Sequence, residues 1–592
     1  MRGRRSFVTG IADAIEMYNQ GRFQEVEQIC SAISSESESY AQAQHLLGLL
    51  AYQHGMLAEA EVFLLNAIAL RPREAMFRNH LGSVQCALGR LDDGIATYRR
   101  AIKLNPRLAD THFNLGNALK RKGEFLKAQR AMKRALELNP DLDGAKLNLA
   151  ILLRDQGQTE KAEKLLERAM QQHPDHVSIA SNYLFNLNYH ITDGQRLFDA
   201  HLKFAETHAV KTGLSPTSYV NIPDKNRRLR IGYVSADLYR HSVAYFFEPL
   251  LRQHQRDNFE IFCYSSVIKT DDITERLQGF TDVWRDVSQL PDRSVAEQVR
   301  QDGIDILVDL GGHTSIQRLL VFAEKPAPIQ VTYLGYPNTT GLSSIDYRFT
   351  DIKADPAGNE RWHAERLLRL PGGFLCFSAL NEAPDVEMAP NNAKGYITFG
   401  CFNAMAKIQP ELIQLWSEIL KAVPDSRLLL KNTALSDKEV QKQLLLAFRK
   451  HGVGANRLML HGRLASPQDH LSLYHQVDIA LDSFPYNGTT TSFEALWMGV
   501  PLVSLYGDLH ASRVGLSILS SIGLEDLTAS TPEQYVTVAK VLADDRQRLE
   551  DLRLSLRDLV EQKLCDAESF TCRVEDAFRK IWQEWCEKQN RD

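Results

Sequence analysis

A turn rich in glycine and threonine holds the side chains best suited to chemistry in this sequence. It follows the apolar run 477–481 and reads Asp-Ser-Phe-Pro-Tyr-Asn-Gly-Thr-Thr-Thr-Ser-Phe-Glu over 482–494. Gly488 permits close approach of a ligand to the backbone, and the three threonines after it place hydroxyls beside free N–H groups at the start of a predicted helix. A diphosphate binds well to such donors at the positive end of a helix dipole. The alternative is a threonine-rich N-cap that serves only the helix.

A lysine follows another strand end. The segment Gly-Cys-Phe-Asn-Ala-Met-Ala-Lys spans 400–407 and comes after a short β-rich run. The ammonium group of Lys407 could neutralise charge that grows on a leaving phosphate. Taken alone, Lys407 also fits an ordinary surface lysine.

Acidic and histidine side chains end two further apolar runs. Asp309 and His313 belong to Asp-Leu-Gly-Gly-His-Thr, and Asp237 precedes His241 in a second such segment. Asp and His at strand ends are candidate general acids and bases. A lone histidine is more often a hydrogen-bonded structural residue, so the functional hypothesis depends on these residues meeting at one site.

Two successive sets of β-rich runs alternate with helical segments and would position these residues. The first set is 229–234, 259–264, 304–310, 329–334 and 347–350; the second is 396–402, 427–431, 458–461, 477–481 and 501–506. Strands separated by helices predict parallel sheets with crossover helices. We expect two Rossmann-like lobes, at 228–385 and at 393–592, the second carrying the nucleotide site and the C-terminal helices. Neither contains GxGxxG or a P-loop motif.

The first third of the chain repeats every 34 residues. Pro72, Pro106, Pro140 and Pro174 share this spacing, and small residues recur at fixed phases between them. The pattern resembles the tetratricopeptide repeat, a pair of antiparallel helices that buries its apolar face only against neighbouring pairs. We expect an α-helical solenoid over 7–176 and a helical linker over 177–227. Such arrays bind proteins or peptides in a concave groove; a purely structural solenoid is the alternative.

Composition excludes several other classes. The 592 residues include 44% hydrophobic and 24% charged side chains, with a formal net charge of -5, which gives no basic footprint for nucleic acid. The eight cysteines are scattered without a CxxC pair, and no 18-residue apolar run is present. These features predict a cytoplasmic protein with no disulfide framework, no zinc site and no membrane span.

Five segments, in order, match one enzyme family. They are RLRIGYVSADLYRHSVAYFFEPLL from Arg228, DILVDLGGHT from Asp305, KPAPIQVTYLGYPNTTG from Lys325, FGCFNAMAKIQPELIQLW from Phe399 and ALDSFPYNGTTTSFEALWMGVPLVSLYGDLHASRVG from Ala480. Here the chain resembles the O-GlcNAc transferase family, and within it the SPINDLY-like branch. The resemblance covers nearly the whole chain. It implies a tetratricopeptide-repeat solenoid followed by an α/β GT-B fold, and an inverting protein O-glycosyltransferase that needs no metal or cofactor.

The resemblance also implies roles for single residues. Lys407 matches a lysine that stabilises the departing nucleotide diphosphate, and His241 and Asp309 match groups proposed as base or proton relay, with His313 in the same motif. His470 matches a histidine packed on the nucleotide base. The expected nucleotide-sugar site comprises Asn403, His470, Tyr486, Asn487, Gly488, Thr489, Thr490, Thr491 and the ribose ligand Glu494. The loop 335–341, with Pro337, Thr339, Thr340 and Gly341, is expected to face the sugar and the acceptor.

Three departures from the animal enzymes leave the donor open. Thr489 stands where they carry His, Ala404 where they carry Gln, and Pro467 where they carry a nucleotide-contacting Lys. The runs YPNTTGL, HSVAYF and FPYNGTTT are closer to SPINDLY proteins, plant members of which use GDP-fucose. The sequence therefore predicts transfer of one sugar to Ser or Thr of proteins held by the repeat arm, with GlcNAc from UDP-GlcNAc or fucose from GDP-fucose. A repeat scaffold with vestigial lobes and a GT-B enzyme acting on glycans or small molecules are the alternatives; a homo-oligomer is possible in each case.

Overall fold

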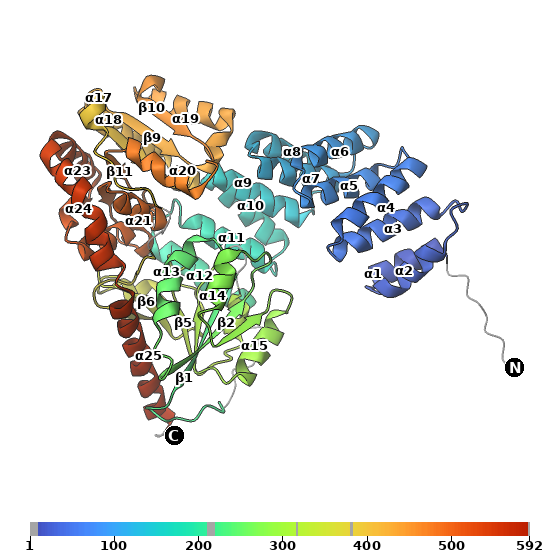
Figure 1. The fold of residues 1–592 in the computed structure, drawn as a ribbon, viewed down its shortest axis with the longest axis horizontal. Coiled ribbons are helices and arrows are strands. Elements are labelled where there is room, and N and C mark those ends of the chain that lie inside the picture. The colour runs from blue at the N-terminus through green and yellow to red at the C-terminus, as the bar shows by residue number, and fades with distance from the viewer. Residues whose placement is uncertain (1–9, 210–218, 315–317, 379–382, 590–592) are drawn as a thin grey trace. The chain divides into compact units, whose positions relative to one another are not determined.

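The computed structural model describes residues 10–209, 219–314, 318–378 and 383–589. The chain divides into two compact units, Met1–Leu152 and Leu153–Asp592 (Figure 1). The first is helical throughout its described residues, and the second holds two parallel sheets. Among the described residues, no helix combines the length and apolar character needed to cross a bilayer.

The first unit is a stack of antiparallel helix pairs. The helices are α1 (Ile11–Asn19), α2 (Phe23–Ala32), α3 (Tyr40–Gln53), α4 (Leu57–Leu70), α5 (Ala75–Ala87), α6 (Leu91–Leu104), α7 (Ala109–Lys122), α8 (Phe125–Leu138) and, entering the second unit, α9 (Asp143–Asp155). Glycines 34 residues apart explain the close pairing. A Cβ on Gly48, Gly82 or Gly116 would lie 2.7–2.8 Å from a side chain of the partner helix. The predicted solenoid is confirmed.

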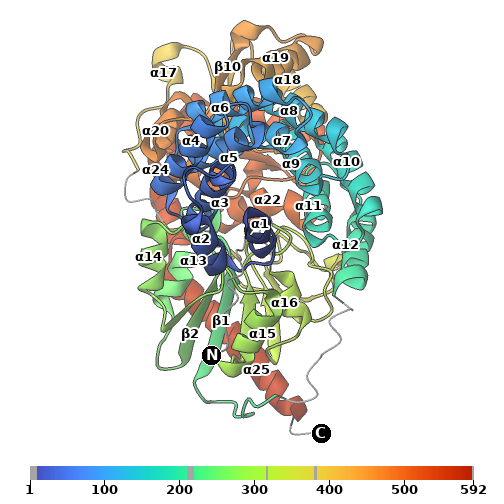
Figure 2. The same cartoon turned by 90° about the vertical axis from the view of Figure 1, so that its right-hand side faces the viewer.

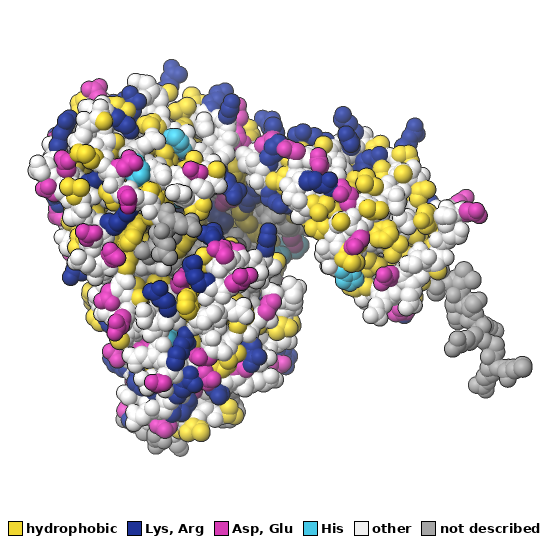
Figure 3. Space-filling view, viewed as in Figure 1, with side chains coloured by type: hydrophobic (Ala, Val, Ile, Leu, Met, Phe, Trp, Pro, Cys, Tyr) yellow, Lys and Arg dark blue, Asp and Glu magenta, His cyan; other side chains and the backbone are white. Residues whose placement is uncertain are grey.

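Apolar side chains remain exposed on this unit. Met56, Val62, Leu65 and Leu70, on or beside α4, are 47–57% exposed. Figure 3 shows hydrophobic side chains gathered on this part of the repeat unit. Single exposed apolar residues are ordinary on solenoids, whose helices have an outer face.

The predicted linker is a packed helical layer of the second unit. It contains α10 (Thr159–Gln172), α11 (Val177–Leu187) and α12 (Gly194–His208). Ala180, Leu184, Leu187, Leu197 and Phe204 form one buried cluster across α11 and α12. The helices are therefore held by a core of their own, and they also cover loops of the sheet domain, as described below.

The first lobe contains a parallel sheet in the order β3-β2-β1-β4-β5-β6-β7. The strands are β1 (Leu229–Ser235), β2 (Phe259–Ser265), β3 (Val283–Asp286), β4 (Ile306–Asp309), β5 (Ile329–Thr332), β6 (Tyr347–Thr350) and β7 (Arg366–Arg369). The helices between them are α13 (Ser242–Gln253), α14 (Asp272–Gln278), α15 (Asp292–Gln301) and α16 (Leu319–Ala323). Every pairing is parallel, so the neighbouring strands β1 and β4 end on the same side of the sheet. Ser235 and Asp309 therefore lie together at the carboxyl ends of these strands.

The second lobe repeats this architecture in the order β10-β9-β8-β11-β12-β13. The strands are β8 (Thr398–Cys401), β9 (Arg427–Lys431), β10 (Leu458–His461), β11 (Ile479–Leu481), β12 (Leu502–Leu505) and β13 (Thr528–Ala529). The helices are α17 (Asn391–Lys394), α18 (Pro410–Ala422), α19 (Lys438–Lys450), α20 (Pro467–Ser472), α21 (Thr490–Trp497), α22 (Val514–Ser521), α23 (Pro532–Asp544), α24 (Arg546–Leu564) and α25 (Ala567–Gln589). The order reverses between β8 and β11, where ligands bind in such sheets. The predicted two-lobed α/β fold is confirmed.

The last helix corrects the predicted extent of the second lobe. Sequence reasoning placed all C-terminal helices in that lobe, but α25 lies beside β1 of the first lobe (Figures 1 and 2). Glu575 accepts a hydrogen bond from His254 Nδ1 at 2.9 Å, and the Phe578 ring is 5.3 Å from that of Phe349. The apolar face of α25 thus completes the core of the first sheet.

Candidate functional site

Asp482 organises the turn after β11. Its carboxylate accepts the backbone N–H of Gly488 at 2.6 Å and of Ser483 at 2.8 Å, and the hydroxyl of Ser504 at 2.8 Å. Burial raises the pKa of Asp482 to about 6. The turn is therefore folded around a carboxylate, and it leads directly into α21, whose first N–H groups have no acceptor within the helix.

Gly488 lies where a side chain would not fit. A Cβ there would be 2.6 Å from Ser492 Oγ, 2.7 Å from Thr491 Oγ1 and 3.1 Å from Asn403 Nδ2. The preceding Asn487 is fully buried, and its amide donates to the Ser483 carbonyl oxygen at 2.7 Å and accepts the Gly515 N–H at 3.2 Å. The backbone of this turn is thus fixed from one side, with Thr489, Thr490 and Thr491 only partly buried at the other.

Lys407 lies directly on this turn. It ends the short helix η3 (Met405–Lys407), and its Nζ donates to the carbonyl oxygen of Asn487 at 2.6 Å. The same Nζ lies 3.9 Å from the centroid of the Tyr486 ring. Burial lowers the pKa of Lys407 to about 8, although the Asp482 carboxylate acts in the opposite direction. The structure thus brings together the lysine and the turn, 80 residues apart, that the sequence singled out separately.

A second group of predicted residues gathers around α21. Asn403 Oδ1 accepts the Thr491 hydroxyl at 2.7 Å. One turn further on, Glu494 Oε2 lies 2.9 Å from His470 Nε2. The His470 ring packs 5.7 Å from that of Phe402, and its Nδ1 is buried with no hydrogen-bond partner among the described residues. This arrangement places an imidazole beside a carboxylate in the first turns of α21, next to the glycine-threonine turn.

Sequence reasoning missed Lys431, which also faces this group. Lys431 ends β9, the strand next to β8. Burial lowers the pKa of Lys431, while the nearby charge of Glu494 acts to raise it. Lys431 could have been predicted from its sequence, because it ends an apolar strand next to β8, where the strand order reverses and ligands bind.

His241 is the predicted acid–base residue that remains accessible. It is the N-cap of α13, where its Nδ1 accepts the Val243 N–H at 3.3 Å, and that nitrogen is 3.7 Å from Asp237 Oδ1. The His241 side chain is 37% exposed. Phe246 on α13 packs against Phe493 on α21 with ring centroids 5.0 Å apart, so the N-terminal halves of these helices meet between the lobes.

Asp309 and His313 are enclosed. Asp309 accepts the N–H groups of Gly311 and Gly312 at 3.0 Å and the Thr332 hydroxyl at 2.8 Å, and burial raises its pKa. His313 is 1% exposed, with Nδ1 3.2 Å from Ser181 Oγ and Nε2 2.9 Å from the Thr340 carbonyl oxygen. Burial lowers the pKa of His313 well below its usual value. Asp309 is 3% and His313 1% exposed, so neither contacts an acceptor hydroxyl directly in this structure; the proton-relay role expected for Asp309 stays a prediction.

The loop 335–341 requires a correction. The sequence placed Pro337, Thr339, Thr340 and Gly341 at the sugar and acceptor, but all four are buried. The hydroxyls of Thr339 and Thr340 donate to the carboxylate of Glu365. A Cβ on Gly341 would lie 2.3 Å from the His201 carbonyl oxygen of α12, because the predicted linker covers the loop.

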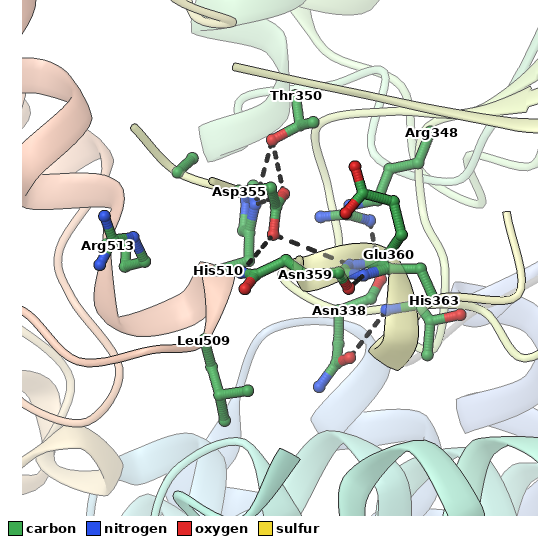
Figure 4. Close-up of polar contacts among 12 residues, drawn as sticks. Asn338, Arg348, Thr350, Asp355, Asn359, Glu360, His363, Leu509, His510 and Arg513 are labelled. Atoms are coloured by element: carbon green, nitrogen blue, oxygen red, sulfur yellow. Dashed lines mark hydrogen bonds and ion pairs between the residues drawn. The ribbon is translucent and has the colours of Figure 1, made fainter. Parts of the chain in front are cut away.

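The two lobes also meet at a buried polar cluster that the sequence did not predict. Figure 4 shows Asp355 of the first lobe between Thr350, Asn359 and His510. Asp355 Oδ2 is 2.7 Å from His510 Nδ1 of the second lobe and accepts the Thr350 hydroxyl at 2.6 Å. Asn359 donates to the Asp508 carbonyl oxygen at 3.0 Å. These contacts hold the loop after β6 against helix η7 (His510–Ser512).

A cavity of about 330 Å³ lies beside this junction. It is bounded by the helical layer, the first-lobe loop and the second lobe, including Asn188, Asn338, Phe484 and Leu509. Phe484 belongs to the same turn as Gly488. Within the described ranges, no three His, Cys, Asp or Glu side chains group as metal ligands; metal independence stays a prediction.

Comparisons with known proteins agree with the two-part architecture. The model of glycosyl transferase family 41 matches residues 181–381 and 387–574, and tetratricopeptide repeat models match 82–123 and 119–181. The family match begins within α11 and includes α12, whereas α10 lies within a tetratricopeptide repeat match.

Three similar proteins cover different shares of the chain. The chain is 43% identical over 413 residues to a Hordeum vulgare protein named probable UDP-N-acetylglucosamine--peptide N-acetylglucosaminyltransferase SPINDLY. The aligned residues make up 69% of this chain and 44% of that protein. The chain is 32% identical over 405 residues, 64% of this chain and 40% of the other, to the Arabidopsis thaliana protein of the same type named SEC. The chain thus spans less than half the length of these curated relatives. A solved structure of a Thermobaculum terrenum O-GlcNAc transferase mutant matches with a TM-score of 0.81 and 36% identity, covering 87% of this chain and 98% of that one.

Proposed function

Because the chain belongs to glycosyl transferase family 41, we propose that it transfers a single sugar from a nucleotide diphosphate donor onto Ser or Thr hydroxyls of protein acceptors. The observation that carries this proposal is the position of Lys407, whose ammonium lies 2.6 Å from the backbone of the glycine-threonine turn. A cation and a helix N-terminus on one turn suit the diphosphate that leaves in such a transfer.

The proposed donor site extends from this turn to Glu494. The diphosphate binds the N–H groups and hydroxyls of Thr489, Thr490 and Thr491, within reach of Lys407. The ribose hydroxyls bind Glu494, and the base packs near His470. His470 Nδ1 has no hydrogen-bond partner among the described residues. Burial of this carboxylate and imidazole supports a site that is already shaped before the ligand arrives.

In the proposed reaction the acceptor oxygen attacks the anomeric carbon opposite the phosphate. The new C–O bond forms as the bond to the phosphate oxygen breaks, and the nucleotide diphosphate leaves with inversion. Lys407 stabilises the charge that develops on the leaving group. His241 takes the proton of the hydroxyl, because it is accessible and Asp237 can stabilise the resulting imidazolium. Asp309 then has a supporting role at the first-lobe strand end.

UDP-GlcNAc is the donor proposed first, because the names of the similar plant proteins specify it. GDP-fucose is an equal candidate, because the runs YPNTTGL, HSVAYF and FPYNGTTT resemble those of SPINDLY proteins, plant members of which use GDP-fucose. A panel of UDP-GlcNAc, GDP-fucose, UDP and GDP in a thermal-shift assay separates them, because binding to the folded state raises the apparent melting temperature. Absence of any shift and of any transfer would favour the scaffold alternative and contradict the proposal.

Protein acceptors are proposed to bind along the repeat array. The experiment that tests the reaction is transfer from labelled donor to a mixture of acceptor peptides and proteins, with Lys407→Ala as the variant. We expect a loss of about 100- to 1000-fold in kcat. Lys442→Ala, on the exposed face of α19, is the matched control and should keep full activity. Activity of Lys407→Ala within about threefold of wild type, with folding intact, would refute the lysine's role.

A further inference from the structure

The end of the helical layer touches the short helix that carries Lys407. Gly157 follows α9, and a Cβ there would lie 3.2 Å from both the side chain and the carbonyl oxygen of Met405 in η3. Two residues later, Thr159 Oγ1 donates to Gln409 Oε1 at 3.0 Å. Thr159 is 1% and Gln409 5% exposed, so this contact is shielded from water.

Gln409, which accepts the hydrogen bond from Thr159, also bonds to the backbone next to Lys407. Its Nε2 donates to the carbonyl oxygen of Ala406 at 2.5 Å, and Ala406 directly precedes Lys407. On the other side, Asn186 of α11 donates to the Thr159 carbonyl oxygen at 2.9 Å. One buried chain of hydrogen bonds therefore joins α11, the start of α10 and the backbone of η3.

A second set of contacts reaches the ammonium end of the same lysine. Tyr189, just after α11, packs against Tyr486 with ring centroids 5.2 Å apart. Tyr189 also packs against Phe185, with ring centroids 5.4 Å apart. The guanidinium of Arg154 in turn lies 5.0 Å from the centroid of the Phe185 ring. Since Lys407 Nζ rests on the Tyr486 ring, the helical layer supports the lysine at its backbone and at its charged end.

We infer that the last helical repeat and the helix after it hold the candidate leaving-group lysine in place, with Thr159, Gln409 and Tyr189 as positioning residues for the transfer reaction. This inference rests on the proposed function of Lys407. It assigns the helical layer a part in the chemical step in addition to any part in acceptor binding. A displacement of about 1 Å in such a group is enough to cost up to about 100-fold in rate.

The first test separates positioning from binding. Thr159→Val keeps the shape of the side chain but removes the hydroxyl donor, and we expect kcat to fall about tenfold with the donor KM within about twofold. Thr159→Ser restores the hydroxyl and should recover most of the rate. Tyr189→Ala should lower kcat similarly, whereas Tyr189→Phe keeps the ring and should be near wild type. Tyr183→Ala is the matched control: Tyr183 lies on α11, the helix that ends just before Tyr189, but its hydroxyl bonds to Glu167 and its ring lines a separate cavity.

The second test needs no catalysis. The pH dependence of acylation of Lys407 by an amine-reactive reagent, read by mass spectrometry of its peptide, reports the pKa of that amine. Burial is the largest influence on this group, so admitting water in Tyr189→Ala should raise its pKa from about 8 toward the ordinary lysine value. The other titratable groups that face it remain in place: Asp482, the Cys401 thiol and the Tyr486 phenol, with Arg154 and Arg348 behind that phenol.

The outcomes are distinguishable. An unchanged labelling pKa in Tyr189→Ala together with unchanged kcat in Thr159→Val would overturn the inference while leaving the proposed function intact. An inactive wild-type protein would contradict the proposed function, and the labelling experiment would still decide whether the helical layer governs Lys407. Equal losses in Tyr183→Ala and Tyr189→Ala would also overturn it, because they would indicate general destabilisation of α11.

Discussion

His510 of the second lobe and Asp355 of the first lobe form a buried pair, with Nδ1 2.7 Å from Oδ2. Asp355→Asn should cost about 1.5 to 3 kcal/mol of the free energy of unfolding, because it removes a buried carboxylate that bonds to His510 Nδ1 and to the Thr350 hydroxyl. Urea denaturation measures this. Glu525→Gln is the control: it removes the exposed pair with Lys353 at the same junction and should cost no more than about 1 kcal/mol. Equal effects of the two changes would show that the buried pair has no special weight.

The same pair predicts a loss of stability in acid. Burial acts to raise the pKa of Asp355, but the charge and hydrogen bond of His510 outweigh it and hold the pKa below the usual range. A carboxyl whose pKa is lower in the folded state contributes stability above its unfolded pKa, about 3.9, and loses it as pH falls through its folded pKa. Melting temperatures should fall more steeply for wild type than for Asp355→Asn as pH drops from about 5 to about 2, since the contribution is lost below the unfolded pKa. Parallel curves would rule out this carboxylate as the source.

Activity should decline in mild alkali. The Lys407 ammonium is the charged form that stabilises the leaving group, and burial lowers its pKa to about 8. The kcat/KM for donor should therefore fall as pH rises through about 8, since this parameter follows ionisations of the free enzyme. Lys407→Arg keeps its charge throughout this range, so its kcat/KM should not show the alkaline decline, although the overall rate should be lower. An alkaline decline of kcat/KM that persists in Lys407→Arg would have to come from another ionisable group.

Gly488→Ala should weaken donor binding. The new methyl group would lie 2.6 Å from Ser492 Oγ and 2.7 Å from Thr491 Oγ1, so the turn must move. Isothermal titration with the preferred donor should detect binding weakened by at least about tenfold. Gly279→Ala, where the nearest atom is 3.4 Å away, is the matched control and should bind normally. Wild-type affinity in Gly488→Ala would exclude the turn from the donor site.

His241→Asn separates the two roles of this side chain. Asparagine is a good N-cap and should preserve the start of α13, but it cannot accept a proton at neutral pH. We expect kcat to fall by about 100-fold or more with little change in melting temperature. A similar fall in donor hydrolysis and in transfer would be consistent with base catalysis; full activity would shift the role to another group.

The alternation of strands and helices was readable because buried parallel strands are continuous apolar runs. The expected runs 229–234 and 259–264 coincide closely with β1 and β2. Strands β3 and β7 were missed because Val-Trp-Arg-Asp and Arg-Leu-Leu-Arg at the two edges of the sheet have charged, half-exposed residues. Apolar periodicity is weak in such strands.

The turn and Lys407 were predicted because glycine, threonine and lysine at strand ends carry local signals. The covering of 335–341 had no such signal. Tyr336 hydrogen-bonds to Asn188 at 2.9 Å and to His201 at 2.7 Å, more than 130 residues away, and local sequence does not encode that contact. The Asp355–His510 pair was missed for the same reason, since each partner alone is an unremarkable polar residue.

The return of α25 to the first sheet bears on how the molecule is made. The strands of the first lobe leave the ribosome more than two hundred residues before Phe578 and Trp582, two large buried side chains of the final helix. Until those are synthesised, Phe349 and its neighbours have no cover on that side, and a nascent chain exposes an apolar sheet face of the kind that aggregates or recruits chaperones. A stop codon ahead of α25 would therefore be expected to damage the lobe translated first.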